Sequence, residues 1–339
     1  MLPRKGGPDS FSTLGAITEF QLRPGHIPLG SPGDSFLVRA GSRVVQDTRG
    51  FYYVGPALSP GRVLLYDSTG QQLRAIGTPG PGPEEIGRIE RIALDPHDTL
   101  HVYHGLRHTV FSPSFESVRT SRLPGRIGGV TFLQDGRQLV TAFVATRERA
   151  GYTMHILDGD SLSLSFGLTS GKGDPVASAM VMAMQVVPSA PEQVWLAHGN
   201  QYRLERWDPS GSLLRVITRD VWWFPASTYP LRTSVQGGIV QEDTAGNLWT
   251  VARIPTLDAK RPIIEGPERK VDYTSYESFY GQWASMVEVI DPQGGRLIAS
   301  QRFPFSISGF VTQGTVCRFN EDDLGYMVLE IHRIRVRRP

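Results

Sequence analysis

A short turn motif, Asp-x-x-Gly, recurs six times along the 339-residue chain and constrains its fold more than any other feature. Aspartate at the start of such a turn accepts backbone hydrogen bonds, and glycine at its end tolerates the positive φ that closes the turn. Because tight turns of this kind join antiparallel strands, the motif predicts an all-β chain of repeated hairpins. The six copies lie at residues 47–50, 67–70, 208–211, 243–246, 291–294 and 322–325.

Strand-like segments recur between the turns in a fixed order. Short β-branched or aromatic segments are expected to form the second strand of each unit, at residues 51–54, 100–103, 139–141, 194–196, 248–251 and 326–328. Third strands are expected at residues 62–66, 108–111, 153–157, 202–207, 286–290 and 331–336. A fourth strand, as at 72–76 and 213–217, follows in every unit except the sixth, where the chain ends.

The N-terminal part of the chain supplies the missing strand. Residues 16–22, ahead of the first unit, have a strand-like composition and no partner within their own unit. Six units closed in this way form a ring without exposed sheet edges. The prediction is a six-bladed β-propeller with four antiparallel strands per blade and a 3+1 closure. It is one domain over residues 15–339, after a flexible segment at 1–14.

The spacing of the turns between third and fourth strands locates an insertion. These turns begin at residues 67, 112, 158 and 208, which are 45, 46 and 50 residues apart, whereas the next begins 83 residues later, at 291. We therefore expect about 33 extra residues at about 254–284 in blade five. This segment contains Tyr273 and other aromatic residues after a charged stretch. It is either a loop that packs over one mouth of the channel or a solvated excursion.

One loop adds a resemblance to this architecture. Residues 80–85 read Gly-Pro-Gly-Pro-Glu-Glu, between the expected first and second blades. With the repeat, this loop makes the chain resemble six-bladed β-propellers of the NHL-repeat-like kind, and among them uncharacterised bacterial proteins with a Gly-x-Gly-Pro-x-Glu loop at this place. The resemblance covers about residues 15–336. It implies the fold alone, because propellers host unrelated activities.

Histidines His101, His104 and His108 have a spacing similar to that of metal ligands. Alternate residues of a strand face opposite sides, so His101 and His104 point away from each other. Only His104 and His108 are left as a candidate pair, across the loop that joins their strands. They are the candidate ligands for a divalent metal, and the competing interpretation is a polar blade edge. No other cofactor is predicted.

Residues on the face where the inter-blade links and the blade-five insertion gather are the candidates for binding a ligand or partner. Trp222 and Trp223 are adjacent in the link between blades four and five, so both cannot be buried in one blade. We expect one to pack under the link and the other to lie on the surface; a lid on the inner strands is the alternative. The complete set of candidates is Arg88, His104, Trp222, Trp223 and Tyr273.

Composition restricts the partners and the compartment. A formal net charge of +2 gives no general attraction to nucleic acid. The most apolar stretch, residues 176–187, is too short to span a bilayer, so no membrane span is expected. The first 30 residues contain no signal-peptide core. We expect the cell envelope or secretion if the start is truncated and the cytoplasm otherwise, and a monomer in either case.

Motifs of known catalytic chemistry are missing from the sequence, including Gly-x-Ser-x-Gly and His-Glu-x-x-His. The first functional hypothesis is therefore a non-catalytic propeller scaffold that binds a small molecule or another protein on its channel-mouth face. The alternative is a metal-dependent hydrolase or lyase, similar to the calcium-dependent lactonases among six-bladed propellers. Its ligand set cannot be transferred to residues of this chain, so no catalytic residue is predicted.

Overall fold

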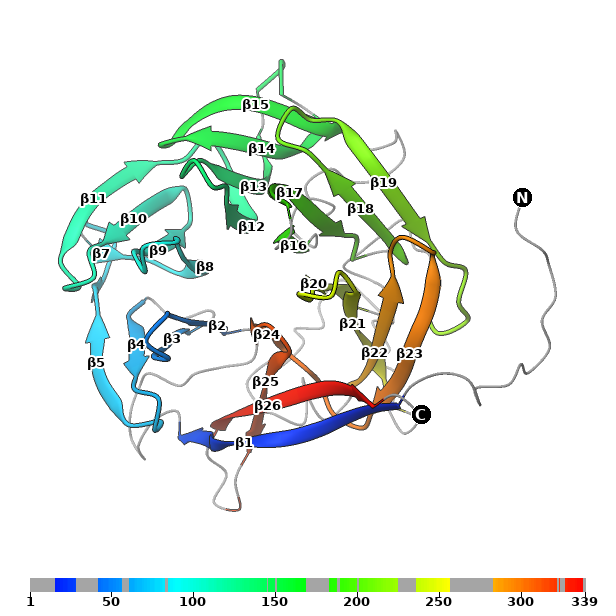
Figure 1. Ribbon diagram of the computed structural model, residues 1–339. Helices are drawn as coiled ribbons and strands as arrows, with labels where there is room; N and C mark the ends of the chain where they lie inside the picture. Colours follow the sequence, from blue (N-terminus) through cyan, green and yellow to red (C-terminus); the bar gives the residue numbers. More distant parts are fainter. Residues whose placement is uncertain are drawn as a thin grey trace, which may run out of the picture.

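The structure is a computed structural model in which six four-stranded antiparallel sheets form a ring, a six-bladed β-propeller (Figure 1). It describes residues 16–28, 42–56, 61–82, 85–144, 146–149, 151–168, 183–187, 190–199, 201–224, 236–256, 283–321, 323 and 327–337. The insertion predicted in blade five falls almost entirely outside these ranges, and so does Tyr273. None of the described residues forms a helix that could span a membrane.

Each blade has its first strand at the centre of the ring and its fourth at the periphery (Figure 1). Blade one contains β2 (Arg43–Gln46), β3 (Tyr52–Gly55), β4 (Val63–Tyr66) and β5 (Gln72–Ile76). Blade two contains β8 (Ile89–Leu94), β9 (Leu100–His104), β10 (Arg107–Phe111) and β11 (Ser117–Arg122). Blade three contains β12 (Arg126–Phe132), β13 (Gln138–Phe143), β14 (Tyr152–Asp158) and β15 (Ser161–Leu168).

The other three blades follow the same order. Blade four contains β16 (Ala183–Val187), β17 (Ala190–Ala197), β18 (Arg203–Trp207) and β19 (Leu213–Thr218). Blade five contains β20 (Gln236–Glu242), β21 (Leu248–Pro255), β22 (Trp283–Asp291) and β23 (Arg296–Phe303). Blade six contains β24 (Gly309–Thr312), β25 (Thr315–Glu321), β26 (Met327–Arg337) and, as its outer strand, β1 (Ala16–Pro28).

The ring closes as the sequence predicts. Strand β1 pairs antiparallel with β26, and its register runs from Ala16 opposite Arg337 to Pro28 opposite Val328. The N-terminal strand therefore completes the last blade. This 3+1 arrangement pairs the edge of β26, which would otherwise be free to pair with another chain.

Blade six also corrects one part of the strand assignment. The segments 326–328 and 331–336 were expected to be its second and third strands, but residues 327–328 and 331–336 belong to the single strand β26. Its second strand is β25, which pairs with both β24 and β26. The Asp-x-x-Gly motif at 322–325 therefore follows the second strand in sequence and precedes the third, and all but one of its residues lie outside the described ranges. No turn-forming residue separates Val328 from Ile331, so the backbone stays extended.

The aspartate turns have the predicted geometry. In the first, Asp47 Oδ1 accepts hydrogen bonds from the backbone N–H groups of Arg49 (3.0 Å) and Phe51 (2.8 Å). Gly50 has a φ of +88°, which places it in the left-handed region that closes a three-residue hairpin loop. The same pair of hydrogen bonds recurs at Asp67, Asp95, Asp208 and Asp243, where the carboxylate accepts from the backbone N–H groups two and four residues after the aspartate.

Apolar packing lies between blades. One cluster joins Tyr53 and Leu65 of blade one to Ile92 and Val102 of blade two, and five further clusters join the other neighbouring blades around the ring. Each buried aliphatic side chain contributes about 1.5–3 kcal/mol to this packing. Face-to-face packing therefore holds neighbouring blades together, and the exposed ends of the blades are available for residues with other roles.

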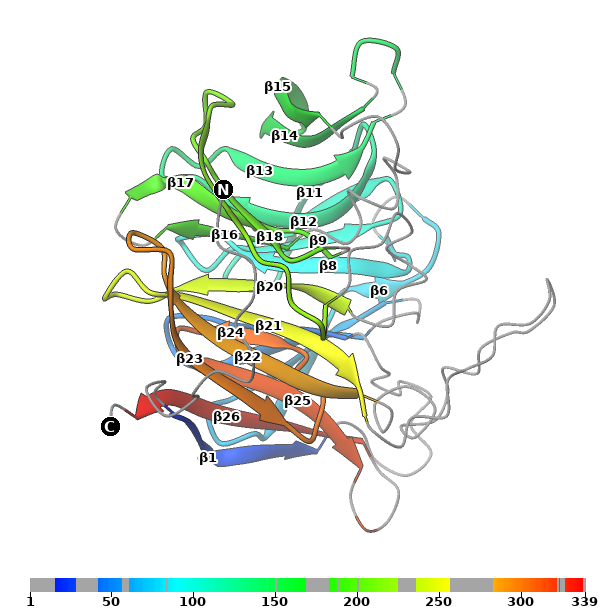
Figure 2. The same ribbon diagram turned by 90° about the vertical axis from the view of Figure 1, so that its right-hand side faces the viewer.

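The two faces of the ring differ in the connections that they carry. Because strands alternate in direction, turns from first to second and from third to fourth strands lie on one face, here called the turn side (Figure 2). Links between blades, and hairpins from second to third strands, lie on the opposite face, here called the link side. Arg88, His104, Trp222 and Trp223 all lie on or next to link-side connections.

Candidate functional site

A hollow of about 830 Å³ opens on the link side of blade two. Residues from all four strands of this blade and from β12 of the next blade line it. Its size is in the range of pockets that hold small-molecule ligands. The side chains on which the following argument depends are Arg88, His104, Leu106, Arg107, Arg122 and Arg126. Two of these, Arg88 and His104, were candidates from the sequence.

Gly80 and Pro81 of the glycine- and proline-rich loop form one wall of the hollow. The Glu85 carboxylate accepts a hydrogen bond from the Gly82 N–H (2.6 Å), and Arg107 Nη1 donates to the carbonyls of Pro81 (2.9 Å) and Gly82 (2.5 Å). A Cβ atom at Gly80 would overlap the Glu85 carboxylate, so a larger residue would displace that carboxylate. Glycine at this position therefore lets Glu85 keep its hydrogen bond to the Gly82 N–H, and Arg107 fixes the wall from the other side.

His104 holds the link that carries Arg88. Its side chain is buried, and Nδ1 accepts a hydrogen bond from the Gly87 N–H (3.2 Å). The proton of the neutral ring is therefore on Nε2, which donates to Thr109 Oγ1 (2.9 Å). Burial, with a contribution from the charge of Arg107, lowers the His104 pKa to about 4. His104 is thus a neutral positioning residue whose backbone partner immediately precedes Arg88.

His108 lies on the opposite face of the same sheet. It is fully buried, its Nδ1 lies 2.7 Å from Asp160 Oδ1, and its Nε2 lies 2.9 Å from Nδ1 of His101. Its ring stacks on Tyr103, with centroids 4.5 Å apart. These contacts face blade three, because Asp160 lies in the turn between β14 and β15.

The strand register explains why the two histidines do not meet. In the pairing of β9 with β10, Tyr103 lies opposite His108 and His104 lies opposite Arg107, so His104 and His108 point to different blades. Their proposed metal site is not brought together by the fold. Among the described residues, no group of three or more His, Cys, Asp or Glu side chains is arranged to hold a metal ion.

The guanidinium groups of the hollow are of two kinds. Arg126 pairs with Glu90, to which its Nε donates at 2.8 Å, and Arg107 is engaged with the backbone of the 80–85 loop. Arg88 and Arg122 are exposed, and within the part of the chain that the structure describes they make no hydrogen bond or ion pair. Two arginines are therefore fixed by the protein, and two are free to contact a ligand.

The tryptophan pair lies elsewhere on the link side. Trp222 is 89% exposed, whereas Trp223 packs edge-on against Tyr202 with ring centroids 5.7 Å apart. Trp223 also stacks on Phe224, at 5.9 Å. The arrangement of one packed and one exposed tryptophan agrees with the prediction from the sequence. Both belong to the link after β19 and line no part of the blade-two hollow.

Two of the three asparagines are engaged within their own blades. Asn247 Nδ2 donates to the Asp243 carboxylate (3.1 Å), and Asn320 Nδ2 donates to Glu330 Oε1 (2.8 Å). Asn247 is a turn residue, and Asn320 lies within β25. Their side chains stabilise a turn and a buried carboxylate rather than a site on the channel.

Sequence reasoning missed Arg107, Arg122 and Arg126. Their signal is their position, because Arg107 and Arg126 begin strands and Arg122 ends one, all at the link side. A search for charged residues at link-side strand ends, made after the blades had been assigned, would have found them. No local motif marks them.

Comparison with known proteins assigns this chain to a class of protein by its fold alone. No known protein family and no curated protein sequence matches the chain. A solved structure of a Bacteroides fragilis NCTC 9343 protein described as exported is similar, with a TM-score of 0.61, 10% identity and 95% of each chain covered. A virginiamycin B lyase from Staphylococcus aureus has a TM-score of 0.50 at 10% identity, over 95% of this chain and 99% of that one. The chain is a six-bladed β-propeller, and the NHL-repeat-like label stays a resemblance.

Proposed function

We propose that this propeller is a non-catalytic scaffold that binds a ligand on its link side, in the hollow over blade two. The observation that supports the proposal most strongly is the hollow itself, which is built from every strand of blade two. Its wall is fixed by Arg107 and Glu85, its link is held by buried His104, and Leu106 supplies an apolar surface that is 42% exposed. Such preorganisation lowers the ordering cost of binding.

A thermal-shift screen with a matched pair of variants tests this proposal. A panel of small metabolites is screened against the full chain, and each stabilising compound is measured again with Leu106→Trp, which places a larger side chain in the hollow, and with Leu73→Trp. Leu73 is an equally exposed leucine on β5, outside the hollow. A ligand of the hollow stabilises the folded protein and loses its effect only in Leu106→Trp. Compounds that stabilise both variants equally place the binding site elsewhere and contradict the proposal.

Catalysis is the alternative outcome of the same screen. Each stabilising compound is recovered after incubation and examined by mass spectrometry, with and without added calcium. The scaffold proposal expects unchanged compound. Turnover of a compound would instead support the hydrolase or lyase hypothesis, which no specific observation in the described residues favours.

We also propose a location in the cell envelope or outside the cell. The support is the similarity in fold to the Bacteroides protein described as exported. Fractionation of the native cells with an antibody against the propeller tests the proposal, and recovery in the cytoplasmic fraction would contradict it. The monomeric state stays a prediction, to be checked by light scattering.

A further inference from the structure

Positive charge is concentrated in the blade-two hollow. Its described lining contains four arginines, Arg88, Arg107, Arg122 and Arg126, against one carboxylate, Glu90. With the Glu85 carboxylate of the adjoining wall counted as well, the excess is two positive charges, so this one hollow carries as much net charge as the +2 of all 339 residues together. A concave surface lined by one sign of charge concentrates the field and attracts ions of the opposite sign.

The nearby histidine does not contribute to this charge. His104 is held neutral by burial and by the Gly87 N–H, which occupies the nitrogen that would have to be protonated. The positive charge therefore comes from guanidinium groups, which stay protonated at every physiological pH. The positive charge of the hollow should therefore vary little over the pH range in which histidines titrate.

Arg88 and Arg122 have the chemistry to contact an anion directly. Both are exposed and have no partner among the described residues, whereas the other two arginines already hold Glu90 and the loop carbonyls. Guanidinium forks match the geometry of carboxylates and phosphates with paired hydrogen bonds. Arg88 precedes β8 near the channel and Arg122 ends the outer strand β11, so the two lie toward opposite ends of the hollow.

We infer that the hollow binds a small polyanion, a ligand with two or more clustered phosphate or carboxylate groups, and that Arg88 and Arg122 contact it. This inference rests on the proposed binding function and names the ligand class. Two separated guanidinium groups match a ligand with more than one anionic group better than a single monovalent anion. Its lining is confined to blade two, the link that precedes it and Arg126 at the start of β12, an extent that fits a small molecule better than an extended polymer.

Calorimetric titration of the full chain tests this inference with two defined probes. Inorganic pyrophosphate carries clustered phosphate charge, and citrate carries clustered carboxylates. Both are titrated at low salt and at about 0.15 M salt, where the Debye length is about 8 Å. Binding of either probe supports the inference, and the stronger of the two identifies the chemistry of the natural ligand. Binding should weaken as salt is added.

A charge-matched pair of variants makes the test specific. Arg88→Gln/Arg122→Gln should weaken binding by about tenfold or more, because two charge-assisted contacts are lost. Arg333→Gln/Arg335→Gln removes the same charge from exposed positions of β26 and should leave the affinity unchanged. Thermal melts of both variants establish that they are folded.

The results that would contradict the polyanion inference are also specific. Failure of both probes to bind the wild-type protein, or equal weakening in the two double variants, overturns the polyanion inference. If stabilisation by a neutral compound from the thermal screen still depends on Leu106, the scaffold proposal survives and only the ligand class is wrong. If the effect of no compound, whatever its charge, depends on Leu106, Arg88 or Arg122, both the scaffold proposal and the polyanion inference fail.

Discussion

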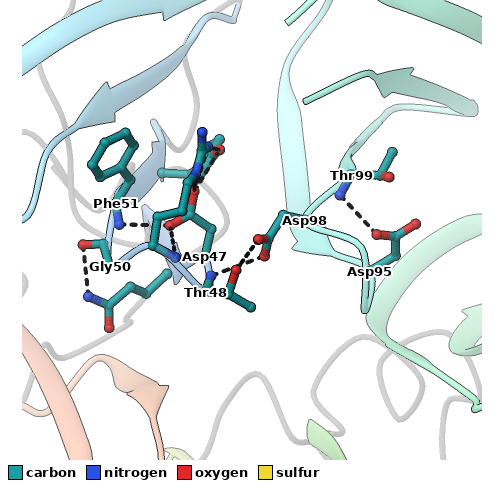
Figure 3. A network of polar contacts seen from close by, with 10 residues as sticks. Asp47, Thr48, Gly50, Phe51, Asp95, Asp98 and Thr99 are labelled. Carbon is teal, nitrogen blue, oxygen red and sulfur yellow. Dashed lines mark hydrogen bonds and ion pairs between the residues drawn. The ribbon is translucent and has the colours of Figure 1, made fainter. Parts of the chain in front are cut away.

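The carboxylate of Asp98 accepts hydrogen bonds from both the backbone N–H and the hydroxyl of Thr48, and thereby joins the turns of blades one and two (Figure 3). The N–H of Thr48 lies 3.1 Å from Asp98 Oδ1. Asp98 occupies the position that glycine holds in the Asp47 turn, and its φ is +61°. A residue other than glycine therefore tolerates the left-handed region here, where its side chain connects two blades (Figure 3).

Substitutions at Asp98 separate the connection from the backbone conformation. Asp98→Gly loses the hydrogen bonds to Thr48 but accepts the positive φ, so we expect the free energy of unfolding to fall by about 1 kcal/mol. Asp98→Ala loses the same bonds and adds a left-handed alanine, which costs about 1 kcal/mol more. Urea denaturation measures both values. Equal stability of the two variants would show that the positive φ carries no strain.

Acid should destabilise the protein in two steps. Burial lowers the pKa of His101 and of His104 to about 4, below the value of 6.5 for an unfolded histidine. The unfolded chain then binds more protons than the folded one between these values, so stability is lost as the pH falls from about 6.5 to 4.

Buried carboxylates extend this loss at lower pH. The pKa of Glu205 and that of Glu330 are each about 2, since hydrogen bonds and nearby cations outweigh the cost of burial. Their contribution is present above about 4.5 and disappears as the pH falls toward 2. Melting temperature measured against pH checks both steps. The variant His104→Gln should show a shallower decline between pH 6.5 and 4, and an unchanged slope would contradict the assignment of that step to His104.

Gly80 should be required for the wall of the hollow in a way that Gly105 is not. A Cβ at Gly80 meets the Glu85 carboxylate, whereas a Cβ at Gly105 meets nothing within 4 Å. Gly80→Ala should break the hydrogen bond to the Gly82 N–H and accelerate hydrogen exchange at that amide. Gly105 has a φ of +59°, so Gly105→Ala costs about 1 kcal/mol of backbone strain but should leave exchange at Gly82 unchanged. Equal exchange in the two variants would argue against the role of Glu85.

Closure of the ring should depend on β1 and not on the residues before it. A chain that begins at residue 29 lacks β1 and leaves the edge of β26 unpaired. We expect it to melt at a lower temperature and to associate through that edge, as seen by size-exclusion chromatography. A chain that begins at residue 15 retains β1 and is the control, which should match the full chain. Equal behaviour of the two truncations would contradict the 3+1 closure.

The fold could be predicted from the sequence because its signals are local. An aspartate turn is specified within five residues, and the spacing of such turns gives the number of blades. Blade six was partly misassigned because the same motif also occurs between a second and a third strand. There, Arg318 and Asn320 give β25 a polar character, since both contact the buried Glu330 carboxylate of the neighbouring strand. That partner lies across the sheet and is not visible in the local pattern.

The candidate site was only partly visible in the sequence. Alternation along a strand correctly separated His101 from His104, and Arg88 was chosen because it lies on a link. Arg107, Arg122 and Arg126 come from three different segments and meet only through the folding of blade two and its contact with blade three. Convergence of this kind depends on tertiary structure, so residue spacing alone does not reveal it.

Hydrogen–deuterium exchange with and without pyrophosphate tests the central claim most directly, because it locates a bound ligand on the folded chain. The account predicts slower exchange at residues 80–82, 85–88, 104–107 and 120–126, which line or adjoin the hollow, and no change at the turn-side loops near Asp47 and Asp243. Protection of the turn side, or of the link around Trp222 in place of blade two, would contradict it.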